Sequence, residues 1–220
     1  MRKGIPALLL TLSLLLCGCR LLPERIPPAG LTVHFLDVGQ ADCALLESGG
    51  EYMLIDGGNR EDGRLVVSYL EQQGVEELAY VVCTHAHEDH VGGLPSVLAV
   101  YPTHAVYAPT GTYASKVFDD FVYYADQQRL EITIPSPGDS WTLGETSVTV
   151  LGPVQSYADQ NDTSIVLNVR YGGTSFLFTG DMETTAENDM LDYWGSRMSW
   201  KADVLKVGHH GSDTSTGYRF

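Results

Sequence analysis

One segment constrains the fold of this chain more than any other, and it reads Thr84-His85-Ala86-His87-Glu88-Asp89-His90-Val91-Gly92-Gly93. It follows Leu78–Cys83, a continuous apolar run with the length of a buried strand. The chain is therefore expected to leave a sheet at Thr84. A loop at the rim of a sheet can turn several side chains toward one point, and Gly92-Gly93 gives the backbone room to bend.

Three imidazoles and an aspartate this close together predict a metal site for two ions. His85 and His87 are two residues apart and can face one ion, while Asp89 and His90 can face a second ion nearby. Imidazole nitrogen and carboxylate oxygen suit zinc and similar ions, so we predict two divalent metal ions, zinc or manganese. The alternative interpretation is a solvated histidine-rich turn.

The pattern His-x-His-x-Asp-His after a strand resembles the signature of the metallo-β-lactamase superfamily. Five other motifs follow the order of one branch of that family: Asp37-Val38-Gly39-Gln40, Leu54-Ile55-Asp56-Gly57-Gly58, Asn161-Asp162-Thr163-Ser164, Phe178-Thr179-Gly180-Asp181 and Val207-Gly208-His209-His210-Gly211-Ser212. The branch is the extracellular hydrolase domain of ComEC-like competence proteins, which serve DNA uptake, and its stand-alone lipoprotein relatives. The resemblance covers about Leu31 to the last residue.

The resemblance implies further site residues. Asp181 is expected to bridge both ions, although an aspartate there can also cap the following helix. Of the adjacent histidines, we assign His209 to the metal and turn His210 toward substrate; the sequence alone leaves this choice open. The predicted ligands are thus His85, His87, Asp89, His90, Asp181 and His209, and the predicted catalytic residues are Asp89 and His210.

Four residues are predicted to support the ligands. Asp56 ends an apolar strand, and in this superfamily such an aspartate braces the metal loop. Asp37 belongs to a rim group with Gln40 and Asp42, where the family usually has glycine in place of Ala41. Asn161 and Asp162 occupy the region of the superfamily's third ligand histidine, which this chain lacks. Asp162 could supply an oxygen to one ion or stabilise the turn.

The beginning of the chain resembles a bacterial lipoprotein signal peptide. A charged start precedes the apolar stretch Ala7–Leu16, which is too short to span a bilayer as an ordinary helix. Leu16-Cys17-Gly18-Cys19 then resembles a lipobox, with Cys19 as the lipidated residue. We therefore expect residues 1–18 to be a signal peptide, residues 19–30 a proline-rich tether, and the protein to be extracytoplasmic and anchored in the membrane by lipid. The alternative is a secreted protein cut nearby.

Residues 31–220 are expected to form one metallo-hydrolase domain. The formal net charge of −15 argues against broad electrostatic adhesion to nucleic acid, though not against a local basic mouth. The remaining cysteines, Cys43 and Cys83, lie in apolar strand sequence. We expect them to be buried thiols, with a disulfide as the alternative, because strand cysteines pair only if their strands are neighbours in register.

The order of elements predicts the α/β/β/α sandwich that the resemblance also implies. Helices are expected at Gly63–Gln73, Leu94–Val100, Tyr113–Arg129 and Glu183–Tyr193. Strands are expected at Leu31–Asp37, Cys43–Glu47, Tyr52–Ile55, Leu78–Cys83, Ala105–Tyr107, Ile132–Ile134, Ser140–Leu143, Ser147–Leu151, Ser164–Tyr171, Thr174–Thr179 and Val204–Val207. Similar chains continue beyond His-His-Gly-Ser, so we expect a sandwich truncated at its C-terminal end, with a short second sheet and an open edge.

These observations predict a cell-surface, two-metal hydrolase of phosphodiester bonds. The implied substrate is DNA, or else a phosphocholine-type ester of the envelope; no protein partner is inferred. Hydrolysis of another ester or of a β-lactam is an alternative within the enzyme class. A metal-stabilised surface protein that binds without catalysis is the alternative outside it.

Overall fold

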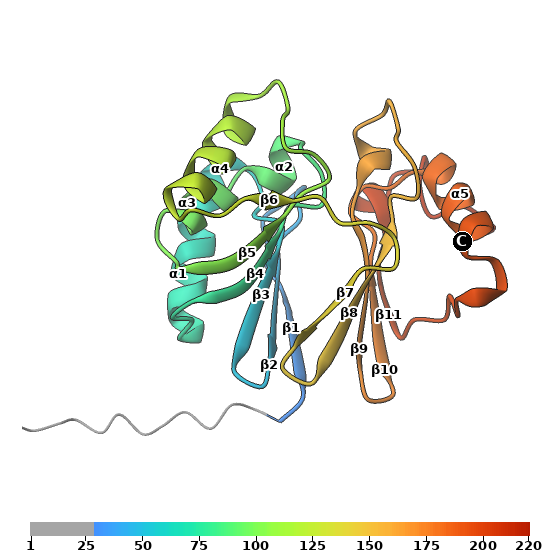
Figure 1. Ribbon diagram of the computed structural model, residues 1–220, viewed down its shortest axis with the longest axis horizontal. Helices are drawn as coiled ribbons and strands as arrows, with labels where there is room; N and C mark the ends of the chain where they lie inside the picture. Colours follow the sequence, from blue (N-terminus) through green and yellow to red (C-terminus); the bar gives the residue numbers. More distant parts are fainter. Residues whose placement is uncertain (1–28) are drawn as a thin grey trace, which may run out of the picture.

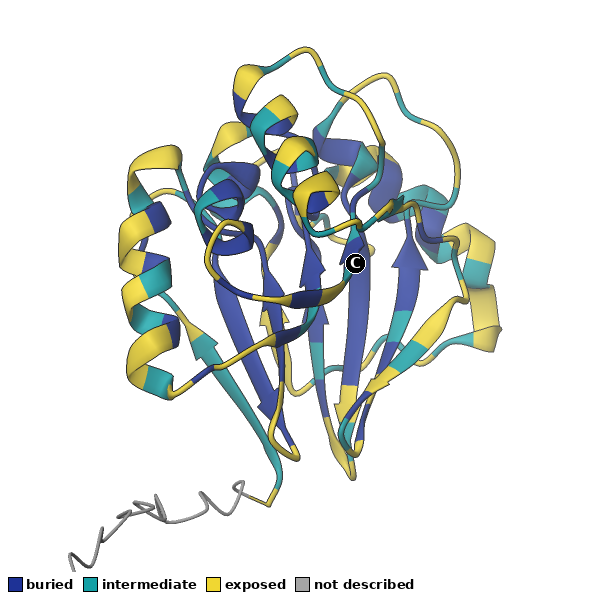
Figure 2. Cartoon of the chain, turned by 60° about the vertical axis from the view of Figure 1, so that its left-hand side comes forward, coloured by how far each residue is buried: buried dark blue, intermediate teal, exposed yellow. Residues whose placement is uncertain are grey.

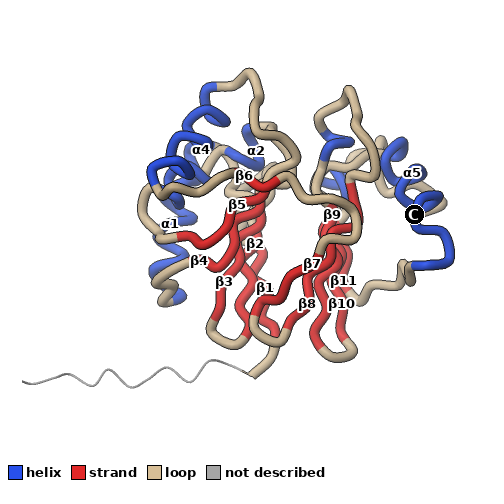
Figure 3. The backbone as a smooth tube through the Cα atoms, in the orientation of Figure 1, coloured by secondary structure: helices blue, strands red, loops and turns tan. Residues whose placement is uncertain are grey.

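The computed structural model describes residues 29–220, which form two β-sheets with helices on their outer faces (Figures 1 and 3). The first sheet contains six strands in the order β1-β2-β3-β4-β5-β6. Its first three strands pair antiparallel and its remaining pairs are parallel. The strands are β1 (Leu31–Phe35), β2 (Ala44–Ser48), β3 (Glu51–Ile55), β4 (Leu78–Val82), β5 (Thr103–Tyr107) and β6 (Ile132–Thr133).

The second sheet contains five strands in the order β11-β10-β9-β8-β7. All its pairs are antiparallel except β10 with β11. The strands are β7 (Ser140–Leu143), β8 (Thr146–Gly152), β9 (Val166–Tyr171), β10 (Thr174–Phe178) and β11 (Val204–Lys206). The edge strand β11 is short, and its Val204 and Leu205 are 36% and 37% exposed.

The helices fall into two groups. On the first sheet lie α1 (Gly63–Gln73), α2 (Glu88–Val91), α3 (Leu94–Leu98) and α4 (Lys116–Gln127), and on the second lies α5 (Thr184–Trp194). Single 3-10 turns occur at η1 (Arg60–Asp62), η2 (Asn161–Thr163), η3 (Gly195–Arg197) and η4 (Gly208–Gly211). Helix α4 begins later than the sequence predicts, because the Ser115 hydroxyl accepts the Phe118 N–H and caps it there.

Three apolar clusters hold these layers together, and the two-residue period of the strands explains them. In β2 and β3, Leu45 and Leu54 point to the cluster beneath α1, α3 and α4. The alternate residues, including Leu46 and Met53, point to the cluster between the two sheets. A third cluster joins the outer face of the second sheet to Met190 and other residues of α5. Figure 2 shows the buried strands enclosed by helices that are exposed on their outer faces.

The predicted α/β/β/α sandwich is therefore confirmed. Cys43 and Cys83 are both buried and free, as predicted, and burial raises the pKa of each thiol. The predicted signal peptide, Cys19 and most of the tether lie outside the described residues. None of the helices within residues 29–220 combines the length and apolar character that crossing a bilayer requires.

Candidate metal centre

The predicted site residues converge at one rim of the sandwich, where loops from both sheets meet. Parallel strands β3 and β4 end side by side, so Asp56 and the histidine loop leave the first sheet together. In the second sheet, the parallel pair β10 and β11 likewise brings Asp181 close to His209 and His210. Strand topology thus brings together residues that are more than a hundred positions apart in the chain.

Asp56 makes hydrogen bonds to the histidine loop. Its carboxylate is 1% exposed and accepts the Thr84 N–H and the Thr84 hydroxyl, each at 2.7 Å. The same carboxylate contacts Nδ1 of His90 at 2.8 Å. A proton on Nδ1 satisfies this contact and leaves Nε2 of His90 as the free ligand atom.

Glycine allows the loops of this rim to approach each other closely. A Cβ added at Gly93 would collide with the Gly57 carbonyl oxygen. Gly180, at φ +52°, lies where a Cβ would stand 3.0 Å from Cβ of Thr84. The contact of Gly93 with Gly57 lets the histidine loop pack against the end of β3. The contact of Gly180 with Thr84 lets the Asp181 loop pack against the histidine loop.

His85 and His87 form one side of the group. Nε2 of His85 lies 3.1 Å from Nδ1 of His87 and 3.9 Å from a carboxylate oxygen of Asp181. His85 is fully buried, and the Cys83 thiol donates to its carbonyl oxygen at 2.9 Å. The structure thus brings the first predicted pair together beside the predicted bridging aspartate.

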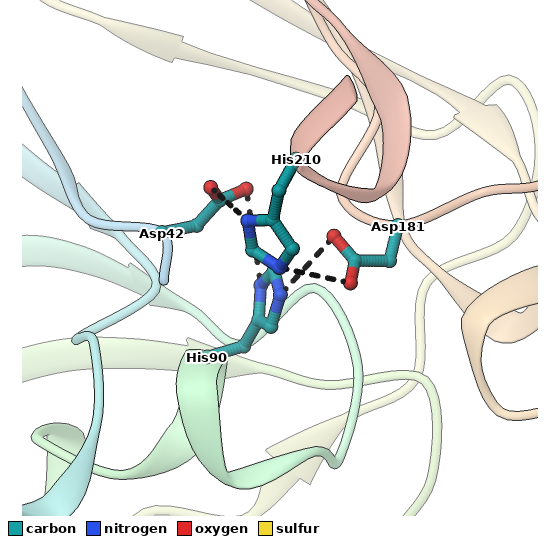
Figure 4. A group of neighbouring side chains, drawn as sticks. All are labelled: Asp42, His90, Asp181 and His210. Atoms are coloured by element: carbon teal, nitrogen blue, oxygen red, sulfur yellow. Dashed lines mark ion pairs between the residues drawn. The ribbon is translucent and has the colours of Figure 1, made fainter. Parts of the chain in front are cut away.

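The most compact group consists of Asp42, His90, Asp181 and His210, whose ligand atoms all lie within 4.8 Å of one another (Figure 4). Asp181 contacts Nε2 of His90 at 3.1 Å through one oxygen and Nε2 of His210 at 3.2 Å through the other. Asp89 lies against the same group, with an oxygen 3.2 Å from Nε2 of His210.

The two adjacent histidines take different places from those expected. His210, predicted to turn toward substrate, enters the compact group and has 13% of its side chain exposed. His209, predicted as the ligand, is 31% exposed, and its Nε2 stands 3.9 Å from Asp181. Both residues have positive φ, 46° and 52°, a local geometry that the sequence did not indicate. Both imidazoles border Asp181, and His210 is the more enclosed.

Nδ1 of His209 is itself held in place. It lies 3.0 Å from a carboxylate oxygen of Glu183 and 3.2 Å from the Thr214 hydroxyl. The Asn161 amide donates to the same Glu183 oxygen at 3.2 Å, and Asp162 accepts the Glu183 N–H at 3.0 Å. Asn161 and Asp162 therefore lie behind His209 and support it through Glu183.

Asp37 is not brought into the group. Its side chain is exposed and accepts the Gly39 N–H at 3.3 Å, within its own turn. Asp42 is the residue of this rim loop that reaches the imidazoles, with an oxygen 3.4 Å from Nδ1 of His210. Asp42 also contacts Nζ of Lys206 at 2.6 Å, so the Lys206 charge is already paired.

Comparison with known proteins agrees with this geometry. A sequence model of the Metallo-beta-lactamase superfamily matches residues 36–220. The chain belongs to the metallo-β-lactamase superfamily. Members of this superfamily are usually hydrolases.

Two curated relatives are competence and recombination proteins by name. The chain is 28% identical over 207 residues to ComE operon protein 3 of Bacillus subtilis (strain 168), which covers 86% of this chain and 26% of that protein. It is 31% identical over 210 residues to Recombination protein 2 of Haemophilus influenzae, covering 92% of this chain and 24% of that protein. The chain thus spans about a quarter of the length of these relatives.

The fold also has solved counterparts. One is MEM-A1, a subclass B3 metallo-β-lactamase from a soil metagenome library. The two share 16% identity at a TM-score of 0.56, covering 84% of this chain and 80% of that one. At this identity the likeness concerns the fold alone.

The residues present fit the metal centre that the superfamily implies. Nε2 of His90, Nε2 of His210 and one oxygen of Asp181 are buried and have no hydrogen-bond partner among the described residues. These atoms nevertheless stand 3.1 to 3.2 Å from oppositely polarised neighbours. Only protonated imidazoles could donate to Asp181 across these distances; once the imidazoles are neutral, the buried atoms face one another unsatisfied, which indicates a place for cations.

Electrostatics leads to the same conclusion. Burial disfavours a charged His90, but Asp56 and Asp181 outweigh it and raise the pKa of His90 to about 10. The carboxylates of Asp181, Asp42 and Asp89 raise the pKa of His210 to about 11. In the metal-free protein, protons on the two imidazoles offset the negative charge of the neighbouring carboxylates. A bound divalent cation would offset the same charge and displace those protons.

Two residues that contact the predicted ligands, Asp42 and Glu183, have no ligand role in the sequence analysis. Asp42 was noted only as a member of a rim group, yet β2 begins two residues later and pairs Ala44 with Ile55, one residue before Asp56. That pairing places Asp42 at the same rim as Asp56, and it could have been found from the expected hairpin. Glu183 was read as the start of a helix, and no local pattern indicates that it reaches His209.

Proposed function

We propose that this chain is a binuclear, metal-dependent phosphodiesterase, with DNA as the first candidate substrate. The observation that carries the proposal is the position of Asp181. One of its oxygens faces His90 at 3.1 Å, and the other faces His210 at 3.2 Å and both His85 and His209 at 3.9 Å. A carboxylate shared in this way between two sets of imidazoles suits a pair of ions.

The residues divide into two ligand sets around Asp181. His85 and His87 would hold one ion, with His209 on the open side, and Asp89, His90 and His210 would hold the other, with Asp42 beside them. Two bound ions would lower the pKa of water and offset the negative charge of a phosphodiester.

The protein side chains contribute orientation and proton transfer. The contacts of Nδ1 with Asp56 and with Glu183 would leave Nε2 of His90 and Nε2 of His209 to face an ion. Asp89 is only partly buried and can accept the proton of an incoming water. Lys206 forms an ion pair with Asp42, so its role is to position the Asp42 carboxylate rather than to bind the substrate as a free cation.

Relatives named for competence and recombination support nucleic acid as the substrate. The test is hydrolysis by purified protein loaded with zinc or manganese. Bis-p-nitrophenyl phosphate, single-stranded DNA and a chromogenic cephalosporin should be offered in parallel, with Asp181→Ala as the inactive control. Cleavage of the two phosphodiesters is expected. Cleavage of the cephalosporin alone would identify a β-lactamase, and metal binding without any cleavage would identify a binding protein.

We also propose that the protein acts outside the cytoplasm, anchored to the membrane through lipid on Cys19. The support is the lipobox-like sequence Leu16-Cys17-Gly18-Cys19 and the competence-protein relatives. The native protein should partition into detergent with the membrane fraction, and Cys19→Ala should release it or leave it unprocessed. Unchanged partitioning of that variant would remove the proposal.

A further inference from the structure

A groove of about 470 Å³ opens at the rim of the sandwich that carries the predicted metal ligands. Pro109, Thr110 and Thr112 form one wall, in the loop between β5 and α4. Gln160 and Thr163 contribute to the other wall, in the segment that follows β8. These segments belong to the two loops that rise highest in Figure 1. The volume lies within the range of about 300–1,000 Å³ that is usual for small-molecule sites.

The first wall is joined to the histidine loop. Tyr113 follows Thr112 directly, and its ring lies edge-on to the His87 ring with centroids 6.3 Å apart. At the base of this wall, the Cys83 N–H donates to the Tyr107 carbonyl oxygen at 2.9 Å. A group bound along this wall would therefore extend toward His87.

The second wall is joined to the other side of the metal group. Thr163 lies in η2 with Asn161, whose amide contacts the Glu183 carboxylate that holds His209. The Ile165 N–H, two residues further on, donates to the Thr84 carbonyl oxygen at 2.8 Å. The groove thus lies between the segment that contacts His87 and the segment that contacts His209 through Glu183. One end of an ester bound at the ions would extend into this groove.

The lining of this groove carries no formal charge. Its side chains, all in the described part of the chain, are prolines, hydroxyl and amide residues, two aliphatic residues and Tyr157. Carboxylates lie behind it: Gln155 and Tyr157 both donate to Asp189, at 2.7 and 3.2 Å, and the Ser136 N–H donates to Asp139 at 2.8 Å. Binding of a chain of phosphates rests on lysine and arginine, which this lining lacks. Hydroxyl and amide groups instead suit neutral, hydroxyl-bearing ligands.

We propose that this groove binds an uncharged, hydroxyl-bearing group on one side of the scissile phosphodiester, such as a terminal sugar or nucleoside. The inference rests on the proposed function and narrows it. The groove should favour substrates in which the scissile phosphodiester carries an uncharged terminal group on this side, over substrates that continue there with further phosphates. On a nucleic acid, the preferred position is the bond that releases a terminal nucleoside unit.

Two chromogenic esters test the groove. One is thymidine 3′-(p-nitrophenyl phosphate), and the other is the same compound with an added 5′-phosphate. The reacting bond is identical, and the two differ only at the far side of the nucleoside, where a phosphate replaces the neutral 5′-hydroxyl. The metal-loaded protein is expected to favour the first ester about tenfold in kcat/KM, the size of a like-charge penalty near a protein surface. Thr112→Lys, an exposed substitution, should reduce or invert that preference.

A matched control is Thr174→Lys, which adds the same charge on the exposed hairpin between β9 and β10. It should leave the preference unchanged, and thermal unfolding should show that both variants are folded. Equal rates for the two esters, with no effect of Thr112→Lys, would overturn the groove assignment and leave the phosphodiesterase proposal standing.

Hydrolysis of neither ester would count against the phosphodiesterase proposal instead. The groove would then be tested by calorimetric binding of thymidine 3′-phosphate and thymidine 3′,5′-bisphosphate to the metal-loaded protein. Tighter binding of the monophosphate, lost in Thr112→Lys, would support the groove. Equal or weaker binding of the monophosphate would overturn it.

Discussion

The proposed metal ligands come from two parts of the chain, which are held in place by different means. The first half is the histidine loop at residues 84–93, and the second half contains His209 and His210. The histidine loop follows β4, which lies between two parallel neighbours, and its His85 and His90 are fully buried. His209 and His210 follow β11, a three-residue edge strand, and remain partly exposed. The first half is positioned by the sheet and by the buried carboxylate of Asp56.

Side chains of α5 and its N-terminus position the second half. Glu183 holds His209, and the buried Glu187 accepts the backbone N–H groups of Thr216 and Gly217 just beyond it. Thr184 adds hydrogen bonds to the Thr214 carbonyl oxygen. The first half is therefore held by hydrogen bonds that are fully buried, whereas several hydrogen bonds of the second half, including those of Thr214, are exposed to solvent.

The largest effect is expected where the halves meet. Asp181→Ala removes the carboxylate that faces imidazoles from both halves. We expect at least about a 1,000-fold loss of phosphodiesterase kcat/KM, equal to several kcal/mol of charge stabilisation, together with a lower metal content. Asp37→Ala is the control, because Asp37 is exposed in its own turn. Equal losses in both variants would contradict the shared role of Asp181.

Next in size is the effect of pH on metal affinity. The pKa values of about 10 for His90 and about 11 for His210 mean that both imidazoles are protonated at neutral pH in the metal-free protein. A metal must displace those protons, so affinity should rise with pH, by up to about a hundredfold per unit below pH 10 for two protons. Indicator titration in weak buffer should detect about two protons released per chain on filling. Metal binding without proton release would show that these imidazoles are neutral beforehand.

The brace of the buried half should matter mainly for stability. Asp56→Asn keeps the size of the side chain but removes an acceptor and the charge that faces His90. Breaking a buried charged contact costs about 3 kcal/mol or more, so we expect a loss of that size in the free energy of unfolding of the metal-free protein. Urea denaturation followed by tryptophan fluorescence would measure it. An unchanged midpoint would show that burial alone suffices to hold the histidine loop.

The smallest effect is expected for the brace of the exposed half. Glu183→Gln keeps an oxygen near His209 but loses its charge, so metal affinity should fall by about tenfold with little change in the free energy of unfolding. Competition with a chromogenic chelator would report the affinity, and Glu61→Gln on the 3-10 turn η1 would serve as control. A stability loss as large as that of Asp56→Asn would erase the distinction between the two halves.

Much of the fold could be predicted from the sequence, because strand and helix periods are local properties of the chain. The apolar run before Thr84 predicted where the chain leaves the sheet, and the strands expected at Cys43–Glu47 and Tyr52–Ile55 overlap β2 and β3. The spacing of His85, His87, Asp89 and His90 needed no tertiary information, because these residues lie within six positions. The supporting role of Asp56 was expected from the resemblance, because an aspartate at the end of this strand usually braces the metal loop in the superfamily.

Tertiary structure alone decided which distant residues meet. The entry of His210 into the compact group depends on two consecutive positive φ angles, which no local pattern signals. Asp42 joined the group and Asp37 did not, because only the former lies where β2 enters the shared rim. Glu183 reaches His209 across 26 residues through the packing of α5 on the second sheet. Sequence patterns reflect residues that are close along the chain and related by the helix or strand period. These contacts instead depend on strand order and on the packing of the layers, which bring together residues far apart in the sequence.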